Sequence, residues 1–206
     1  MNIILIAPPA AGKGTQSELI CKRYQMNHIS TGDLLREVAN KDDEKSLEIK
    51  EMMNNGLLIS DEIILDLIEG KIKEDDSFIF DGFPRTLNQA VKFDELLNKL
   101  NKKIDYVIYL KVNKDIAVNR IDKRYVCPKC NNVYTIDNEP KICKNCGSEL
   151  SKRKDDNVET FEERYNVYMN ETFPIIDYYR NQGLVHEVDS SKTPNEVFDE
   201  IESIIG

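Results

Sequence analysis

Residues 3–15 read IILIAPPAAGKGT, and this stretch decides the fold. Its four leading apolar residues are typical of a short strand that is buried on both faces. Small residues then form a loop, and a helical pattern follows from Gln16 to Tyr24. A helix that begins after such a loop presents unpaired N–H groups and the positive end of its dipole to an anion. Lys13 adds a full charge, and Thr15 adds a hydroxyl that can lie near a phosphate-bound Mg²⁺. The stretch therefore predicts a phosphate-binding loop.

The composition is ordinary for a globular protein, with 40% hydrophobic and 32% charged residues in a chain of 206. That length suffices for one α/β domain with small inserted lobes. The formal net charge of −9 disfavours a protein that coats nucleic acid, because such binding needs a basic surface. A small nucleotide needs only a locally basic cleft. We therefore expect no nucleic-acid partner.

The first residues carry no targeting signal. Met1 runs directly into the first predicted strand, without the basic segment, apolar segment and cleavage site of a secretory leader. No apolar run approaches the roughly 18 residues of a membrane-spanning helix. We expect a soluble, cytoplasmic protein with no membrane partner. In a reducing compartment, its five cysteines are better explained as metal ligands or core residues than as disulfides.

Strands and helices are predicted to alternate along the chain. Short apolar runs predict further strands at residues 27–29, 78–80, 106–112 and 184–188. Helices are predicted at residues 34–39, 61–73, 86–100, 116–123, 159–180 and 194–205, and a charged helical pattern runs from 42 to 54. Ser30 and Thr31 suit the cap of the helix at 34–39, Ser60 suits that of the helix at 61–73, and Thr86 is expected to start the helix at 86–100. The alternation predicts an α/β fold whose parallel sheet has helices on both faces.

Two Cys-x-x-Cys pairs, separated by twelve residues, indicate a metal site. They are Cys127 with Cys130, and Cys143 with Cys146. Each pair offers two thiolates to one tetrahedral ion, and Zn²⁺ takes four such ligands in closed structural sites. Iron fits the same geometry, and two disulfides are the rival interpretation. The segment has no long apolar run, so a metal would replace a hydrophobic core. Cys21 is predicted to pack in the first helix.

Positive charge is concentrated in the middle of this acidic chain. Residues 120–154 hold nine Lys or Arg against four Asp or Glu. The segment is either a solvated basic ribbon or a cationic flap that closes over phosphates. Arginine binds two oxygens at once and stays charged. The candidates for phosphate contacts are Arg85, Arg120, Arg124, Arg153 and Arg164.

A second motif follows the predicted strand 78–80. Asp81 stands where a strand-end carboxylate enters the ligand crevice of an open α/β sheet. It either holds water on a Mg²⁺ ion or caps the helix that starts at Thr86. Arg85 lies beside it in a loop that Gly82 and Pro84 constrain.

The sequence shows no Ser-His-Asp arrangement and no paired catalytic carboxylates, and it predicts a structural role for both histidines, His28 and His186. Such a pattern suits phosphoryl transfer, where positioning and charge neutralisation supply most of the catalysis.

These motifs, in this order, resemble the adenylate kinase family of nucleoside monophosphate kinases, in its bacterial zinc-containing form. The resemblance runs from Met1 to about Ile205. It rests on GKGTQ at 12–16, STGD at 30–33, DGFPRT at 81–86, the four paired cysteines and RKDD at 153–156. It implies a P-loop kinase fold and a phosphotransferase that moves a phosphoryl group reversibly from ATP to AMP with Mg²⁺, giving two ADP and serving adenine nucleotide homeostasis.

The resemblance also implies a set of binding residues. ATP would contact Ala10, Ala11, Gly12, Lys13, Gly14, Thr15, Arg124, Val133, Tyr134 and the backbone at Lys192. AMP would contact Thr31, Arg36, Leu57, Leu58, Ile59, Gly82, Phe83, Pro84, Arg85, Gln89, Arg153 and Arg164. The catalytic set would be Lys13, Asp81, Arg85, Arg120, Arg124, Arg153 and Arg164. The implied domains are a core at 1–29, 60–123 and 157–206, an AMP-binding lobe at 30–59 and a zinc-binding lid at 124–156, in a monomer.

The chain departs from the family pattern at two alanines and in the lid. Ala7 and Ala10 stand where the family has glycines. A left-handed alanine costs roughly 1 kcal/mol, and its methyl group can crowd a phosphate. Twelve residues between the cysteine pairs are fewer than in the family's usual zinc lids, which makes the contacts of Val133 and Tyr134 less secure.

Two other functions fit parts of the sequence. One is a kinase for another nucleoside monophosphate, such as UMP or CMP, although Thr31 and Gln89 resemble the adenine-selective pattern. The other is a zinc-ribbon module that binds nucleic acid or protein, which the net charge and the motif at 81–85 disfavour.

Overall fold

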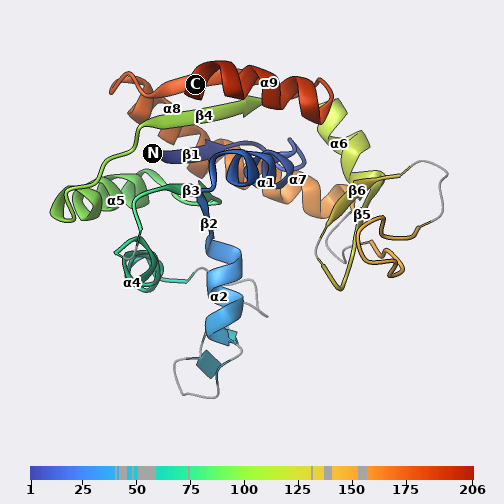
Figure 1. Ribbon diagram of the computed structural model, residues 1–206, viewed down its shortest axis with the longest axis horizontal. Helices are drawn as coiled ribbons and strands as arrows, with labels where there is room; N and C mark the ends of the chain where they lie inside the picture. Colours follow the sequence, from blue (N-terminus) through green and yellow to red (C-terminus); the bar gives the residue numbers. More distant parts are fainter. Residues whose placement is uncertain are drawn as a thin grey trace.

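The structure is a computed structural model that describes residues 1–39, 41, 46–47, 49–50, 59–73, 75–130, 132–136, 141–152 and 157–206; of Asp33 and Arg36 it describes the backbone only. Its centre is a five-stranded parallel sheet in the order β2-β3-β1-β4-β7 (Figure 1). The strands are β1 (Asn2–Ile6), β2 (Asn27–Ser30), β3 (Phe78–Asp81), β4 (Tyr106–Lys111) and β7 (Val185–Asp189). The predicted parallel sheet is confirmed.

Helices cover both faces of the sheet because each central strand is apolar on both sides. The α-helices of the described residues are α1 (Lys13–Tyr24), α2 (Thr31–Ala39), α4 (Asp61–Ile72), α5 (Leu87–Lys99), α6 (Lys114–Asp122), α7 (Val158–Val167), α8 (Phe173–Arg180) and α9 (Pro194–Ile205), and not all of them lie on the sheet (Figure 1). Ile4 and Ile6 of β1 pack in one core with α4, α5 and α8. Ile3 and Leu5 pack in a second core with α1 and α9.

The predicted Ser60 cap is confirmed, and Thr86, predicted to start its helix, is the N-cap residue just before it. Ser60 Oγ accepts a hydrogen bond from the backbone N–H of Ile63, and Thr86 Oγ1 accepts one from that of Gln89. Cys21 packs partly buried against the core beneath α1, as predicted. No helix among the described ranges has the length and apolar character needed to cross a bilayer.

The long helix predicted over residues 159–180 is interrupted. A π-helical turn, η1 (Tyr168–Thr172), separates α7 from α8. Such single-turn insertions shift every later side chain around the helix axis and recur at functional sites.

The segment around the cysteines forms strands that the sequence did not predict. β5 (Arg124–Val126) pairs antiparallel with β6 (Val133–Thr135), and further bridges join Val126 to Ser151 and Ile142 to Glu149. We call residues 124–130, 132–136 and 141–152 the cysteine ribbon. Its buried apolar cluster has only four members, Cys127, Ile136, Cys143 and Leu150.

The helical prediction for 42–54 falls mostly outside the described residues. Within it, Ile49 is fully buried and packs with Ala39 of α2 and with Ile59. Figure 1 shows α2 leading away from the sheet, while the cysteine ribbon follows α6 on another side of the molecule.

Candidate functional site: a phosphate loop facing an arginine corner

The loop between β1 and α1 has the backbone of an anion site. Gly12 occupies the N-cap of α1 in the left-handed region, with φ of 86°, and brings no side chain that competes for the first N–H groups. The helix begins at Lys13, three residues before the predicted start at Gln16. The helix dipole and the free N–H groups therefore point out of the loop, where phosphate oxygens are stabilised.

The two alanines of the loop differ in conformation. Ala10 has φ of 62° and adopts the left-handed backbone that the family pattern assigns to glycine. Ala7 is not among the residues with positive φ, so alanine fits there without this strain. Only Ala10 bears the cost of about 1 kcal/mol.

Asp81 is the centre of a polar cluster beneath α1. Its carboxylate forms an ion pair with Lys13, accepts a hydrogen bond from Ser17 Oγ at 3.4 Å, and lies 3.3 Å from His28 Nε2. Its side chain is only 12% exposed. Asp81 therefore does not cap α5, a role that Thr86 fills, and the capping interpretation is wrong.

The surroundings of Lys13 act on its pKa in opposite directions. Burial, followed by the positive charges of Arg85 and Arg164, lowers the pKa of Lys13 to about 7. The Asp81 carboxylate opposes this lowering and keeps Lys13 charged, because an opposite charge in contact with the ammonium group favours its protonated form. Arg85 is itself affected, since burial and then Arg164 lower its pKa. Three cations are thus held close enough to repel one another, and a polyanion would relieve that repulsion.

Residues 81–89 run from the end of β3 through a turn into the first residues of α5. We call this segment the β3–α5 corner. Gly82 has φ of 78°, and a Cβ there would lie 3.3 Å from Arg85 Nη2, so glycine avoids both backbone strain and a tight contact. The carbonyl of Gly82 accepts hydrogen bonds from Arg85 Nε at 2.8 Å and from Thr31 Oγ1 at 3.1 Å. Phe83 and Pro84 are buried and joined by a cis peptide bond. Thr31 reaches this corner because Ser30 pairs with Asp81 in the parallel register.

Gln89 closes the corner from the first turn of α5. Its Oε1 accepts from the backbone N–H of Arg85 at 2.8 Å, and its Nε2 donates to Asp61 Oδ1 at 2.8 Å. Thr172, the last residue of η1, donates its hydroxyl to the carbonyl of Arg85 at 2.9 Å. Arg85 is therefore held by its backbone N–H, by its carbonyl and by its side chain.

Other predicted residues lie elsewhere along the carboxyl edge. Arg120 Nη2 donates to the carbonyls of Ser190 at 2.7 Å and, more weakly, of Ser191 and Lys192. It thus holds the loop after β7. Lys192 Nζ donates to Glu200 Oε2 at 2.7 Å. Arg164 lies on α7, where its charge acts on Lys13 and Arg85.

The cysteine ribbon carries three further predicted residues. Arg124 is half-buried in β5, and Val133 is exposed on β6. The Tyr134 hydroxyl lies 3.3 Å from Cys143 Sγ, so the side chain of Tyr134 supports the sulfur cluster. Ile59 is buried against α2. Leu57, Leu58, Arg153 and the side chain of Arg36 lie outside the described residues.

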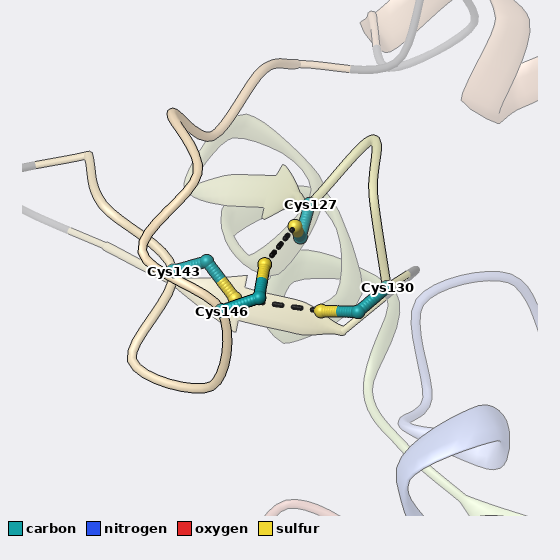
Figure 2. A group of neighbouring side chains, drawn as sticks. All are labelled: Cys127, Cys130, Cys143 and Cys146. Atoms are coloured by element: carbon teal, nitrogen blue, oxygen red, sulfur yellow. Dashed lines mark hydrogen bonds between the residues drawn. The ribbon is translucent and has the colours of Figure 1, made fainter.

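The four predicted cysteines converge on one point (Figure 2). Their sulfur atoms all lie within 4.8 Å of one another, and Cys127 Sγ is 3.4 Å from Cys146 Sγ. These sulfurs are not bonded as disulfides, since an S–S bond measures about 2 Å. Four sulfurs at about 2.3 Å from one tetrahedral Zn²⁺ would lie roughly 3.8 Å apart, so the donor set fits that ion. A hydrogen bond from Tyr134 lowers the pKa of Cys143 to about 6, which favours a thiolate.

Sequence reasoning missed three contributors to the site: His28, Asp61 and Thr172. His28 pairs with Ile79 in the parallel register, so it shares a sheet face with Asp81 two residues further along β3. The alternation of side chains along each strand can be predicted from the sequence, but the register between β2 and β3 cannot. Asp61 and Thr172 carry no motif, and only the packing of α4 and η1 against the corner brings them to Gln89 and Arg85.

A parallel sheet with a Gly-Lys phosphate loop after its first strand defines the class of P-loop kinases. Comparison with known proteins makes the assignment specific, because a family model described as adenylate kinase matches residues 5–184. A protein named adenylate kinase from Archaeoglobus fulgidus is 44% identical over 212 residues, which covers all of this chain and 98% of that protein. Proteins of the same name from Fervidobacterium nodosum and Clostridium botulinum are each 40% identical over 213 residues, covering this chain fully and 98% and 99% of theirs. The chain belongs to the adenylate kinase family, a family of phosphotransferases.

Proposed function

We propose that the protein transfers the γ-phosphoryl group of ATP to AMP, reversibly and with Mg²⁺, to give two ADP. One observation carries the assignment of the site. Besides burial, the charges of Arg85 in the β3–α5 corner and of Arg164 in α7 lower the pKa of Lys13 in the phosphate loop, and the charge of Arg164 also lowers that of Arg85, so the three cations lie close together. Two nucleotides carrying several negative charges would be neutralised at such a point, and neutralisation is the main requirement of phosphoryl transfer.

ATP would lie over the phosphate loop. Backbone N–H groups of residues 10–15 would hold its phosphates, and the ammonium group of Lys13 would move from Asp81 to the phosphate oxygens. The resemblance adds Arg124, Val133, Tyr134 and the Lys192 backbone. The contact of Arg120 with the 190–192 carbonyls supports a role in shaping the loop beside the base.

AMP would occupy the β3–α5 corner. Thr31, Gly82, Phe83, Pro84, Arg85 and Gln89 are linked there through the Gly82 carbonyl, the backbone of Arg85 and the hydrogen bonds of Gln89. Arg36, Leu57, Leu58, Ile59, Arg153 and Arg164 complete the proposed set. An oxygen of the AMP phosphate would then attack the γ-phosphorus, and the ADP leaving group would retain the bridging oxygen. Arg85 and Arg164 would stabilise charge on the moving group.

Thr15 and Asp81 are the residues that would hold Mg²⁺, Asp81 through water. When bound, the ion neutralises charge on the β- and γ-phosphates. Asp81 fits this role because it ends β3 at the crevice edge and sits beside the first turn of α1.

The four cysteines would hold a structural Zn²⁺, with iron as the alternative occupant. Four thiolates leave no open coordination position, so the ion would stabilise the ribbon and take no part in the reaction. We propose that residues 124–156 act as a lid that excludes water, residues 30–59 as the AMP lobe, and the remaining residues as the core. We further propose a cytoplasmic monomer whose partners are nucleotides, with no nucleic-acid or membrane partner.

The test is ADP formation by the purified protein with Mg²⁺ and ATP, measured with AMP, UMP, CMP and GMP in parallel. Rapid ADP formation with AMP alone is the expected result. Preference for UMP or CMP would make the protein a kinase of the other nucleotide. A thermal shift with oligonucleotides, but none with a bisubstrate nucleotide, would favour the zinc-ribbon binding module instead.

A further inference from the structure

The carboxamide of Gln89 is held in one orientation by groups outside any nucleotide. Gln89 is 6% exposed, so its amide must find partners within the protein. Oε1 accepts from the N–H of Arg85, and Nε2 donates to Asp61 Oδ1, each at 2.8 Å. A carboxylate only accepts and a backbone N–H only donates. If the amide were flipped, its oxygen would face the Asp61 carboxylate and its NH₂ group would face the backbone N–H of Arg85. Both hydrogen bonds would then be lost.

Such a fixed amide distinguishes purine bases by their hydrogen-bonding edges. Each amide end keeps capacity for one more bond, because the NH₂ group has two hydrogens and the carbonyl two lone pairs. Adenine offers a 6-amino donor beside the N1 acceptor. Hypoxanthine, otherwise the same ring system, offers a 6-oxo acceptor beside an N1–H donor. A freely turning glutamine suits either base, whereas a fixed one suits only one of them.

We propose that Asp61 is a specificity-determining positioning residue, which selects adenine over 6-oxopurine monophosphates by fixing the flip of Gln89. The inference rests on the proposed function, in which Gln89 contacts the AMP base. Asp61 would touch no nucleotide and would act through the amide alone.

The placement of Asp61 follows from helix packing. Ser60 caps α4, and Asp61 is the first residue of that helix, where its charge suits the positive end of the dipole. α4 packs beside α5, and Asn88 Nδ2 also donates to Asp61, at 2.6 Å. The Asp61 carboxylate is therefore itself held in place. A residue that orients another side chain must be fixed in this way.

The next residue supplies a matched control. Glu62 stands in the same first turn and bridges the same two helices through Lys92, at 2.8 Å, without contacting Gln89. Glu62→Gln removes a charge and a helix–helix tether of the same kind as Asp61→Asn does. The two variants differ in whether Gln89 loses its orienting partner.

The experiment measures kcat/KM with AMP and with inosine monophosphate for the full chain and both variants. Asp61→Asn keeps the shape but offers either an oxygen or an NH₂ group to Gln89, so the flipped amide becomes accessible. We expect the AMP-to-IMP ratio to fall about tenfold or more in Asp61→Asn, and to stay unchanged in Glu62→Gln.

Two results would overturn the inference. One is an unchanged ratio in Asp61→Asn with equal losses for both nucleotides, which marks a purely structural role. The other is an equal fall of the ratio in Glu62→Gln. Gln89→Leu separates this failure from that of the proposed site. If Gln89→Leu leaves the KM for AMP unchanged, the base is not at Gln89 and the proposed AMP site itself fails.

Discussion

The β3–α5 corner and the cysteine ribbon both belong to the proposed nucleotide site, but they are stabilised in different ways. The corner rests on the apolar core. Phe83 is 1% exposed and packs edge-on against Phe93, with ring centroids 5.1 Å apart. The ribbon has one small apolar cluster, two of whose four buried members are cysteines. Burial of large aromatic side chains supports the corner, whereas thiolate–metal bonds would have to support the ribbon.

This difference suits the corner to holding a side chain in a fixed position and the ribbon to moving as a unit. Arg85 in the corner is held at its N–H, carbonyl and guanidinium, which suits a group that must meet a reacting phosphate within a fraction of an ångström. The buried cluster of the ribbon is separate from the two cores that flank the sheet, and a unit of this kind can move without disturbing the rest of the fold. Changes in the corner should therefore affect catalysis, and changes at the cysteines should unfold one region.

Replacement of Arg85 tests the corner and has the largest expected effect. In Arg85→Ala, we expect kcat to fall by about 10³-fold, because one charge that neutralises the transition state is lost. Steady-state ADP formation measures this, with melting temperature recorded beside it. Arg180→Ala is the control, since Arg180 pairs with Asp177 and Glu187, neither of which belongs to the proposed site. A loss of the same size in Arg180→Ala would show that the corner holds no special charge.

Metal removal tests the ribbon. With a chelator, or in Cys143→Ser, we expect amide hydrogens in residues 124–136 and 141–152 to lose protection from exchange while those of β1, β3 and β4 keep theirs. Activity should fall about 10²-fold as the proposed lid groups lose their geometry. Cys21→Ser is the matched control, because Cys21 lies in α1, away from the cluster. Cooperative loss of protection across the sheet as well would contradict the separation of the two regions.

Thr172 offers a finer test of how the corner is held. Thr172→Val removes the hydroxyl that donates to the Arg85 carbonyl but keeps the shape of the side chain. The loss of one such hydrogen bond, about 1 kcal/mol, corresponds to a roughly fivefold fall in kcat/KM. Thr172→Ser should restore activity. A fall in melting temperature without any change in kinetics would instead assign Thr172 to the stability of η1.

The sequence predicted what depends on neighbours along the chain. The apolar runs predicted the five parallel strands to within a residue or two at their ends, and Ser60 was a correct cap because capping spans only three residues. The spacing of the two Cys-x-x-Cys pairs likewise predicted the cluster of four cysteines. The π-helical turn η1 escaped prediction because one inserted residue hardly alters a 3.6-residue pattern.

The rest of the site depended on contacts between distant segments. Asp81 meets Lys13 across 68 positions, and Gln89 meets Asp61 across 28. Neither pairing leaves a local signal, since each arises from the register of parallel strands or from the packing of two helices. The three-residue strands β5 and β6 were missed for a related reason, because polar ribbons lack the alternation that marks a strand.

The smallest expected effect concerns the phosphate loop, which belongs to neither region. Ala10→Gly should raise the free energy of unfolding by at most about 0.5 kcal/mol, because the relief of about 1 kcal/mol of left-handed strain at φ of 62° is partly offset by about 0.5–1 kcal/mol of added freedom in the unfolded chain. It also removes a methyl group near the proposed phosphates, so the KM for ATP should fall slightly. Ala7→Gly is the matched variant with the opposite sign, since Ala7 has no positive φ and glycine there only adds freedom to the unfolded chain, costing about 0.5–1 kcal/mol. Denaturant unfolding of the two variants measures both values. Equal destabilisation would mean that Ala10 is no more strained than Ala7, and that the loop tolerates both methyl groups without cost.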